Sequence, residues 1–339
     1  MRLLCLCLFS FALLVSTAAT AGQNDGDHPP NVPGQMVNIG GYRMHLYCIG
    51  DGSPSVILLN GAGDIFSDWA LVQPGIAHFT RVCSYDYAWE GFSDAGPVPI
   101  TMHQQAFEAH LMLKNAGISP PYLLVGHSSG GMVAQLYTIT YPTDVAGLVL
   151  VDSLHEDMVM GNAMLRSRAT GKKIPPPQTM KTSPPPKPTP EEQLHYEERL
   201  KRVQAEYSAP AGPPLNKLPS DALRLRAWVH AHPKLLTGAQ SDPMVWMAEE
   251  LQQVHDWRQG KVNPFGDMPL IVIGVLGDNP VSLEERRRQL DDMALLSSNS
   301  KVLSNRESTH HVQWDDPKFV TETVKMNYEA AIHHTKLAK

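Results

Sequence analysis

The sequence contains little cysteine and no concentrated positive charge. Its 339 residues include four cysteines, and no Cys-x-x-Cys pair stands beside the further ligands that a zinc site needs. The net charge is −6, and no run of lysines and arginines forms the basic surface that nucleic-acid binding requires. The sequence therefore implies no metal ion, no organic cofactor and no nucleic-acid partner.

Long apolar runs are equally scarce. The one extended run, residues 3–15, follows Arg2 and precedes Ala19-Thr20-Ala21, which is typical of a signal-peptidase site. Its 13 residues fall short of the roughly 20 that a membrane-spanning helix needs. We expect a signal peptide over residues 1–21, a secreted or periplasmic mature protein, and no stable membrane span after signal removal. An uncleaved anchor and a lipoprotein signal are the alternatives.

The length and composition suit one large globular core, or a core with a smaller insertion. Hydrophobic residues make up 42% of the chain and charged residues 18%. The densest group of charges, residues 284–288, mixes two glutamates with three arginines. We expect this group to form a solvated helix face. The composition does not specify an oligomeric state.

Short apolar segments alternate with helix-type patterns over most of the chain. Residues 36–50 predict a hairpin around two glycines. Further strands are predicted at 55–59, 80–85, 122–125, 145–151, 270–275 and 301–304, with helices at 104–116, after the 122–125 strand and at 320–331. This alternation predicts an α/β fold with a mostly parallel central sheet flanked by helices on both faces.

Residues 154–266 interrupt that alternation. They contain two three-proline runs, at 175–177 and 184–186, which exclude a core strand or helix there. Helical patterns follow near 190–207, 220–232 and 243–258. We expect a core formed by residues 22–153 and 267–339, with 154–266 inserted as a helical, Pro-rich cap or lid. A surface excursion with no role at the site is the alternative.

The segment Gly126-His127-Ser128-Ser129-Gly130 stands between a predicted strand and a predicted helix. Gly-x-Ser-x-Gly at such a corner is typical of a nucleophile elbow, which lifts the central serine above the sheet edge. A Cβ at either glycine would collide with the crossing backbone. The pattern predicts Ser128 as a catalytic nucleophile, and a plain Gly/Ser turn is the alternative.

A serine nucleophile needs a base, and the base needs a carboxylate to orient it. With this elbow, the acid is expected at the end of a later strand and the histidine beyond it. Asp278 follows the 270–275 strand and is the favoured acid, and Asp152, which ends the 145–151 strand, is the alternative. His310 and His311 stand together before the last helix, and spacing alone does not separate them.

The tetrahedral oxyanion needs two backbone N–H donors that are already in place. Ser129, directly after the nucleophile, is expected to supply one. Ala62, in the glycine-rich loop after the 55–59 strand, is expected to supply the other. A simple glycine turn is the alternative interpretation of that loop.

These residues resemble the α/β-hydrolase superfamily, in particular its lid-bearing serine hydrolases. The resemblance covers nearly the whole mature chain and rests on four blocks, at residues 60–69, 85–93, 125–131 and 310–317. In the family's histidine block, an Asp and a Pro follow the catalytic His by five and seven residues. Asp315 and Pro317 stand in that register relative to His310, so the resemblance selects His310 over His311.

The chain departs from the family pattern at several positions. Asn60 stands where the oxyanion block usually begins with His, which implies altered hydrogen bonding behind that loop. Tyr87 and Trp89 stand where Arg and Gly are usual, which predicts a bulkier, more aromatic mouth of the site. No member of the candidate triad is lost.

Two cysteines, Cys48 and Cys83, would remain after signal removal. In an exported chain they form either a disulfide or two buried free thiols. The resemblance implies that the second and fourth strands are neighbours, which favours a Cys48–Cys83 disulfide.

The sequence therefore predicts an exported serine hydrolase that cleaves small-molecule carboxylic esters through an acyl-enzyme on Ser128. A serine at the elbow argues against the haloalkane dehalogenase and epoxide hydrolase branches, which resemble this fold but use Asp there. An amidase or peptidase, an acyltransferase or a lyase with the same triad, and a non-catalytic binding protein on this fold are the alternatives.

Overall fold

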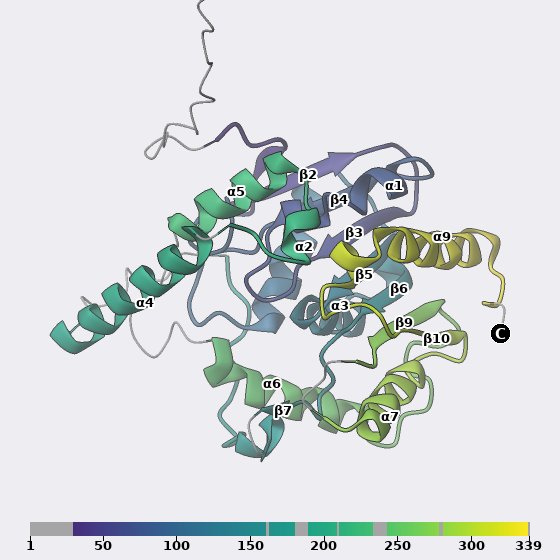
Figure 1. The fold of residues 1–339 in the computed structure, drawn as a ribbon. Helices are drawn as coiled ribbons and strands as arrows, with labels where there is room; N and C mark the ends of the chain where they lie inside the picture. The colour runs from purple at the N-terminus through teal and green to yellow at the C-terminus, as the bar shows by residue number, and fades with distance from the viewer. Residues whose placement is uncertain are drawn as a thin grey trace, which may run out of the picture.

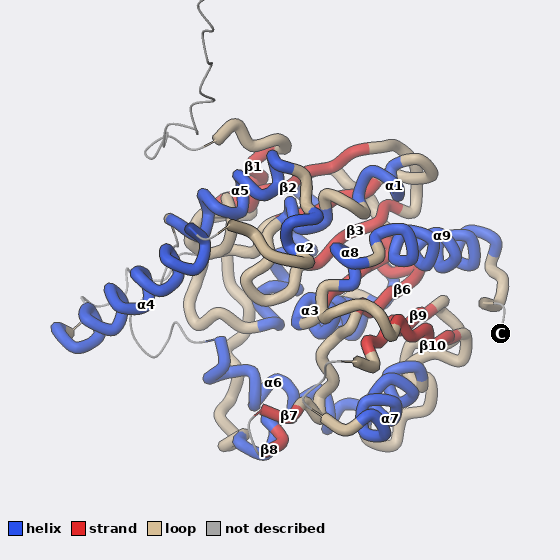
Figure 2. The backbone as a smooth tube through the Cα atoms, in the orientation of Figure 1, coloured by secondary structure: helices blue, strands red, loops and turns tan. Residues whose placement is uncertain are grey.

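The computed structural model describes residues 30–160, 163–179, 189–208, 210–232, 243–277 and 281–337. Its centre is an eight-stranded sheet in the order β1-β2-β4-β3-β5-β6-β9-β10, with helices on both faces (Figures 1 and 2). The strands are β1 (Gln35–Asn38), β2 (Arg43–Ile49), β3 (Ser55–Leu59), β4 (Val82–Tyr85), β5 (Tyr122–His127), β6 (Val145–Val151), β9 (Leu270–Val275) and β10 (Ser300–Asn305). The first two strands form the predicted hairpin, and all pairings from β4 to β10 are parallel. The predicted fold class is confirmed.

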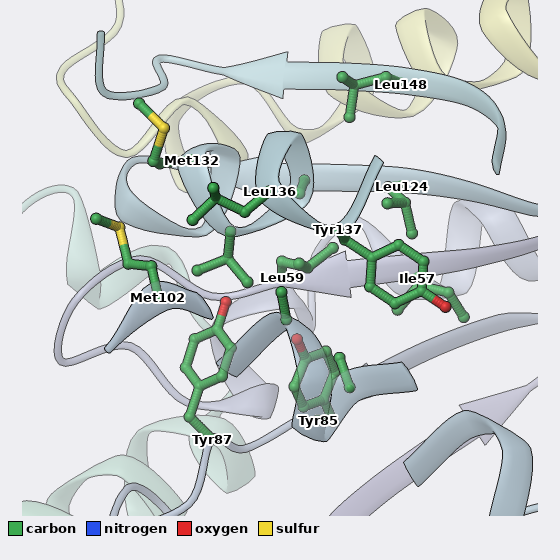
Figure 3. Close-up of a cluster of buried hydrophobic side chains, with 14 of the residues drawn as sticks. Ile57, Leu59, Tyr85, Tyr87, Met102, Leu124, Met132, Leu136, Tyr137 and Leu148 are labelled. Carbon is green, nitrogen blue, oxygen red and sulfur yellow. The ribbon is translucent and has the colours of Figure 1, made fainter. Parts of the chain in front are cut away.

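Successive side chains along a strand point to opposite faces of the sheet, so alternate residues pack into two separate hydrophobic cores. Ile57 and Leu59 belong to one core, and Val56 and Leu58 belong to the other. The first core is covered by α2 (Met102–Asn115), α3 (Ser129–Thr140) and α7 (Leu283–Ala294), and the second by α1 (Gln73–Ala77) and α9 (Pro317–His333). Figure 3 shows part of the first core, where Leu136 and Tyr137 of α3 lie beside strand residues.

The described parts of the inserted region contain the α-helices α4 (Pro190–Ser208), α5 (Ser220–Ala231) and α6 (Pro243–Arg258). All three match predicted helical patterns. Figure 1 shows α4 extending away from the sheet, with α5 lying over the β2 end of the molecule and α6 below α3. Short elements complete the region and the connections: β7 (Val159–Met160), β8 (Ala163–Met164), η1 (Phe66–Trp69), η2 (Pro142–Asp144), η3 (Leu165–Arg168) and η4 (Leu215–Lys217).

Several sequence predictions fall wholly or partly outside the described residues. The predicted signal peptide, 1–21, and the second proline run, 184–186, lie outside them. The first proline run, 175–177, belongs to neither helix nor strand, as expected. Within the described parts of the chain, no helix is long and apolar enough to span a membrane.

Cys48 of β2 and Cys83 of β4 are bonded to each other. The two residues are direct partners in the antiparallel pairing of these strands, and their sulfur atoms form a disulfide. The strand adjacency that favoured this bond is therefore present. The bond closes a loop with a sequence separation of 35 residues in the half of the sheet that precedes the elbow.

Replacing both Cys48 and Cys83 by alanine is expected to lower the free energy of unfolding by about 2–4 kcal/mol, because a loop of this length regains its freedom in the unfolded chain. Guanidinium unfolding of the unreduced protein measures the effect, with reduced wild-type protein as the matched control. Titration of two free thiols in unreduced, unfolded wild type would contradict the bond.

Candidate active site

Ser128 occupies a sharp turn between β5 and α3. Its backbone adopts φ 52° and ψ −122°, a conformation that a side-chain-bearing residue rarely holds unless its surroundings enforce it. A Cβ on Gly126 would lie 2.4 Å from the Gly130 carbonyl oxygen, and one on Gly130 would lie 2.3 Å from the Asn60 carbonyl oxygen. Both glycines are therefore required by close backbone approach, and the predicted elbow geometry is present.

His310 contacts the carboxylate of Asp152. The Nδ1 atom of His310 lies 2.6 Å from Oδ2 of Asp152, which stands at the carboxyl end of β6. The His310 side chain is 46% exposed, whereas that of Asp152 is 5% exposed. An open imidazole oriented by a buried carboxylate is the arrangement that a general base needs.

The favoured acid of the sequence prediction, Asp278, lies outside the described residues. The carboxylate that contacts His310 belongs instead to Asp152, the alternative acid. Asp152 directly follows β6, which pairs in parallel with β9. The contact between Asp152 and Nδ1 of His310 favours Asp152 as the acid, and the role of Asp278 stays a prediction that the described residues do not test.

Asp152 is held by three groups from three different elements. Its Oδ1 accepts the Val275 N–H at 3.0 Å and lies 2.5 Å from Nη2 of Arg286, while Oδ2 faces His310. Burial alone would raise the pKa of Asp152, but the His310 hydrogen bond, the Arg286 charge and the Val275 N–H outweigh it and hold the pKa below its usual range. The carboxylate is therefore ionised at neutral pH.

The loop that carries His310 is fixed by local contacts before α8 (Val312–Asp315). The backbone N–H and the hydroxyl of Thr309 both donate to Oδ2 of Asp315 at 2.7 Å. The ring centroids of His311 and Trp314 are stacked 3.8 Å apart, and Nε2 of His311 lies 3.6 Å from Oδ1 of Asp64. Of the two adjacent histidines, His310 is therefore the one in contact with Asp152.

A cavity of about 290 Å³ brings Ser128, Asp152 and His310 together. Its remaining wall is partly apolar and partly polar, and it draws on the start of the inserted region, on α7 and on the segment before α7. The lining residues are Ser128, Asp152, Ser153, Leu154, His155, Met158, Val159, Val281, Arg286, Gln289 and His310. Residues 154–159 therefore contribute to the site, which argues against an excursion with no role there.

The two predicted oxyanion donors flank the elbow but do not line this cavity. Ser129 begins α3, and Ala62 is exposed in the turn after β3. That turn is held beside the elbow, because β3 pairs with β5 and the Leu59 and Asn60 carbonyls pack against Gly130. The two predicted donors therefore lie on adjacent segments, the elbow and the turn after β3.

The departures from the family blocks have a structural reason. The Asn60 side chain donates to the Tyr85 carbonyl at 2.7 Å and accepts from the Trp69 indole at 3.0 Å, so it ties the loop after β3 to two neighbours. Tyr87 is 2% exposed and its hydroxyl donates to the Asn60 carbonyl at 3.3 Å. The prediction that Tyr87 makes the mouth more aromatic is wrong, because it packs behind the loop.

A buried charge network lies directly behind Ser128. Nδ1 of His127 lies 3.0 Å from Asp64 Oδ2, and Nε2 lies 2.9 Å from the His310 carbonyl oxygen. Burial would raise the pKa of Asp64, but hydrogen bonds from His127 and His311 bring it well below its usual range. His127 thus links the buried Asp64 carboxylate to the backbone of His310, and it helps to position the loop that carries His310.

Two groups of acid and histidine side chains come close enough to suggest metal ligation. They are Asp64 with His127 and His311, and His155 with Glu156 and Asp292. In the first, Arg226 of α5 pairs with Asp64, and in the second, Arg258 of α6 pairs with both carboxylates. Because an arginine already neutralises each group, we interpret both as ion-pair networks that fasten the inserted helices to the core.

Glu90 is expected to make the protein less stable as the pH rises. Burial and the negative charges of Asp86 and Asp64 raise its pKa from 4.5 to about 8, and its Oε2 has no hydrogen-bond partner among the described residues. Between these values the folded protein keeps a proton that the unfolded chain has lost, so the free energy of unfolding falls by on the order of 1 kcal/mol per pH unit. Glu90→Gln should therefore stabilise the protein more at pH 8 than at pH 5 in denaturant unfolding.

The exposed Glu284 provides the control for this prediction. Glu284→Gln is expected to leave the pH dependence of unfolding unchanged. Equal effects of Glu90→Gln at both pH values would contradict the raised pKa of Glu90.

Comparison with known families and proteins places the whole arrangement in context. Residues 56–323 match the family model described as the alpha/beta hydrolase family. Among curated proteins, an uncharacterized vacuolar membrane protein of Saccharomyces cerevisiae (strain YJM789) is 26% identical over 149 residues, which are 39% of this chain and 23% of that protein. The match thus spans less than a quarter of that relative.

Solved structures extend the likeness over most of the chain. Cfl2 from Burkholderia cenocepacia superposes with a TM-score of 0.61 at 16% identity, covering 86% of this chain and 94% of that one. An esterase from Exiguobacterium antarcticum superposes with a TM-score of 0.58 at 17% identity, covering 87% and 99%. At such low identities these likenesses establish the fold alone.

Proposed function

This chain belongs to the alpha/beta hydrolase family, and from that premise we propose that it cleaves carboxylic esters through an acyl-enzyme on Ser128. The observation that carries the proposal is one cavity holding a strained elbow serine together with a histidine bound to a buried carboxylate. Ser128, His310 and Asp152 line the same pocket, and nucleophilic acyl transfer requires a nucleophile, a base and an orienting acid at one site.

In the proposed reaction, His310 takes the proton of the Ser128 hydroxyl as the serine attacks the ester carbonyl. Because Asp152 occupies the Nδ1 side of the ring, the proton on Nδ1 is held there and Nε2 is left as the base. The same imidazole then protonates the leaving alcohol. A water molecule, deprotonated by His310, then attacks the acyl carbon, and His310 returns the proton to the Ser128 oxygen as the carboxylic acid leaves.

In the proposed reaction, the backbone N–H groups of Ala62 and Ser129 stabilise the oxyanion. Neither has a hydrogen-bond acceptor among the described residues, so both are available to a substrate oxygen. Removing one such donor costs roughly a hundred- to a thousandfold in kcat in a well-studied protease, so the pair would supply a large share of the rate.

The size of the cavity points to a short acyl or alcohol group. Its volume of about 290 Å³ is at the lower end of ligand pockets. The apolar side chains that line it, Leu154, Met158, Val159 and Val281, suit hydrocarbon. A small ester is therefore the substrate class that fits best.

Hydrolysis of a p-nitrophenyl ester series from acetate to laurate, by the mature protein, tests the proposal. We expect turnover with an optimum among the short chains. Turnover of none of these esters, with matched anilides cleaved instead, would move the assignment to an amidase. Turnover of neither class would contradict acyl transfer to water.

We also propose that the protein is exported after cleavage of residues 1–21. The Cys48–Cys83 bond supports export, because such bonds persist in oxidising compartments and are rare in the cytosol. Sequencing the amino terminus of the protein recovered from outside the cytoplasm should begin at Gly22. An intact Met1 on that protein would contradict signal cleavage.

A further inference from the structure

Arg286 is a buried cation in direct contact with Asp152. Its side chain is 7% exposed, and its Nη2 lies 2.5 Å from Oδ1 of that carboxylate. The mixed-charge run 284–288 was expected to form a solvated helix face. Arg287 and Arg288 are exposed as expected, but Arg286 is buried, so the expectation is wrong at this residue. An arginine is taken out of water at considerable cost, which its pairing with Asp152 must offset.

Arg286 lies near the N-terminus of α7, which places its guanidinium at the site. Ser282 caps the helix by accepting the Glu285 N–H, and the Arg286 N–H bonds to the Ser282 carbonyl at 2.8 Å. Arg286 thus stands in the first turn, close to the end of β9, whose Val275 N–H donates to the same oxygen of Asp152. Oδ1 of Asp152 is therefore bound by β9 and α7, and Oδ2 contacts His310.

The two oxygens of Asp152 have different partners with opposite effects on His310. Oδ2 attracts the charge that develops on the imidazole when it takes the serine proton. Arg286, on Oδ1, fixes the carboxylate in place but repels that same charge. A neutral residue at position 286 would free the carboxylate to move and would also make the protonated imidazole easier to form.

We propose that Arg286 is a positioning residue of the active site, which holds Asp152 in register with His310 and sets the lower pH limit of activity. This inference rests on the proposed function, since it assigns a role in the same site. Arg286 acts through Asp152 on the base, so its removal changes kcat and the pH profile more than KM.

Other titratable groups also lie near His310 and remain in place when Arg286 is replaced. The His127 ring lies 4.7 Å from the His310 ring and bonds to its carbonyl, and the His311 ring lies 5.5 Å away. Asp64 lies behind both of these histidines. A shift of the pH profile in an Arg286 variant therefore reports on the guanidinium rather than on this second network.

The test compares kcat and kcat/KM from pH 5 to pH 9 in wild type, Arg286→Met, Arg286→Gln, Arg286→Lys and the control Arg287→Met. Loss of the positive charge in the Met and Gln variants should move the midpoint of the acidic limb upward by about one pH unit. Their kcat at pH 8 should fall by up to about 100-fold through misplacement of the base, with little change in KM. Arg286→Lys should keep the wild-type midpoint, and Arg287→Met should match wild type throughout.

Arg286→Gln keeps a polar group at this buried position, so the test relies on it if Arg286→Met fails to fold. An acidic limb that stays at the wild-type midpoint in the neutral variants would overturn the inference. A change confined to KM would also overturn it, because it would make Arg286 a substrate contact. Absence of activity in wild type itself would instead overturn the proposed function, which separates the two failures.

Discussion

Replacing Ser128 by alanine is expected to lower kcat for ester hydrolysis by about a million-fold, as loss of the serine does in a well-studied protease with the same kind of triad. Without the hydroxyl no acyl-enzyme forms, and the residual rate comes from binding and the oxyanion donors alone. The loss should appear in kcat with p-nitrophenyl butyrate, while substrate binding changes little.

Ser129→Ala is the matched control, because the neighbouring residue is expected to contribute its backbone N–H, which the substitution keeps. It should retain activity close to wild type. Both variants should unfold at a temperature near that of wild type, since Ser128 makes its described hydrogen bonds through the backbone. Activity that survives Ser128→Ala would rule out Ser128 as the nucleophile.

Replacing Asp152 by asparagine is expected to lower kcat by about ten-thousand-fold, while Asp278→Asn should remain near wild type. An amide at position 152 would favour the wrong tautomer of His310 and remove the negative charge that stabilises the imidazolium, and the equivalent change in a trypsin-like protease has an effect of this size. The expectation follows from the 2.6 Å contact between Nδ1 of His310 and Oδ2 of Asp152. Steady-state kinetics on the two variants distinguish the two candidate acids.

Asp152→Asn also removes the partner of a buried arginine, so its stability must be measured alongside its activity. Breaking a buried ion pair by removing one member typically costs about 3–5 kcal/mol. Kinetics should therefore be recorded well below the unfolding temperature of the variant, with its circular dichroism unchanged. A folded Asp152→Asn protein with near-normal kcat, together with an inactive Asp278→Asn protein, would return the assignment to Asp278.

The elements that the sequence predicted well are those whose pattern depends on local physics. The strands at 55–59, 145–151 and 270–275 match their observed limits, because continuous apolar runs flanked by turn residues leave few other structures. The elbow was predictable for a related reason. Its two glycines are required by backbone contacts within a few residues and with the adjacent strand.

The choice of acid could not be made from sequence for a physical reason. In the sequence, Asp152 and Asp278 each come shortly after an apolar strand segment, so the local pattern is the same for both. What selects Asp152 is a set of distant contacts, with Val275, Arg286 and His310, and these lie 123 to 158 residues away along the chain. No local pattern carries that information.

Arg286 and Tyr87 differ from expectation for a shared reason, because residue type alone does not determine the exposure of a side chain. Arg286 stands in a run of charges that would ordinarily face water, yet it is buried against a carboxylate. Tyr87 was expected at the mouth of the site, yet it packs behind the loop after β3 and bonds to Asn60. In both cases a single tertiary partner outweighs the preference of the residue type.

The central claim, that Ser128 is an activated nucleophile, is tested most directly by a fluorophosphonate probe and intact-mass analysis. The mature protein should gain the mass of one phosphonyl group, located on Ser128 by peptide mapping, with faster labelling above the acidic limb of the activity profile. Ser128→Ala should gain none, and Asp152→Asn should react far more slowly. A wild-type protein that stays unmodified, or that carries the group on another residue, would contradict the account.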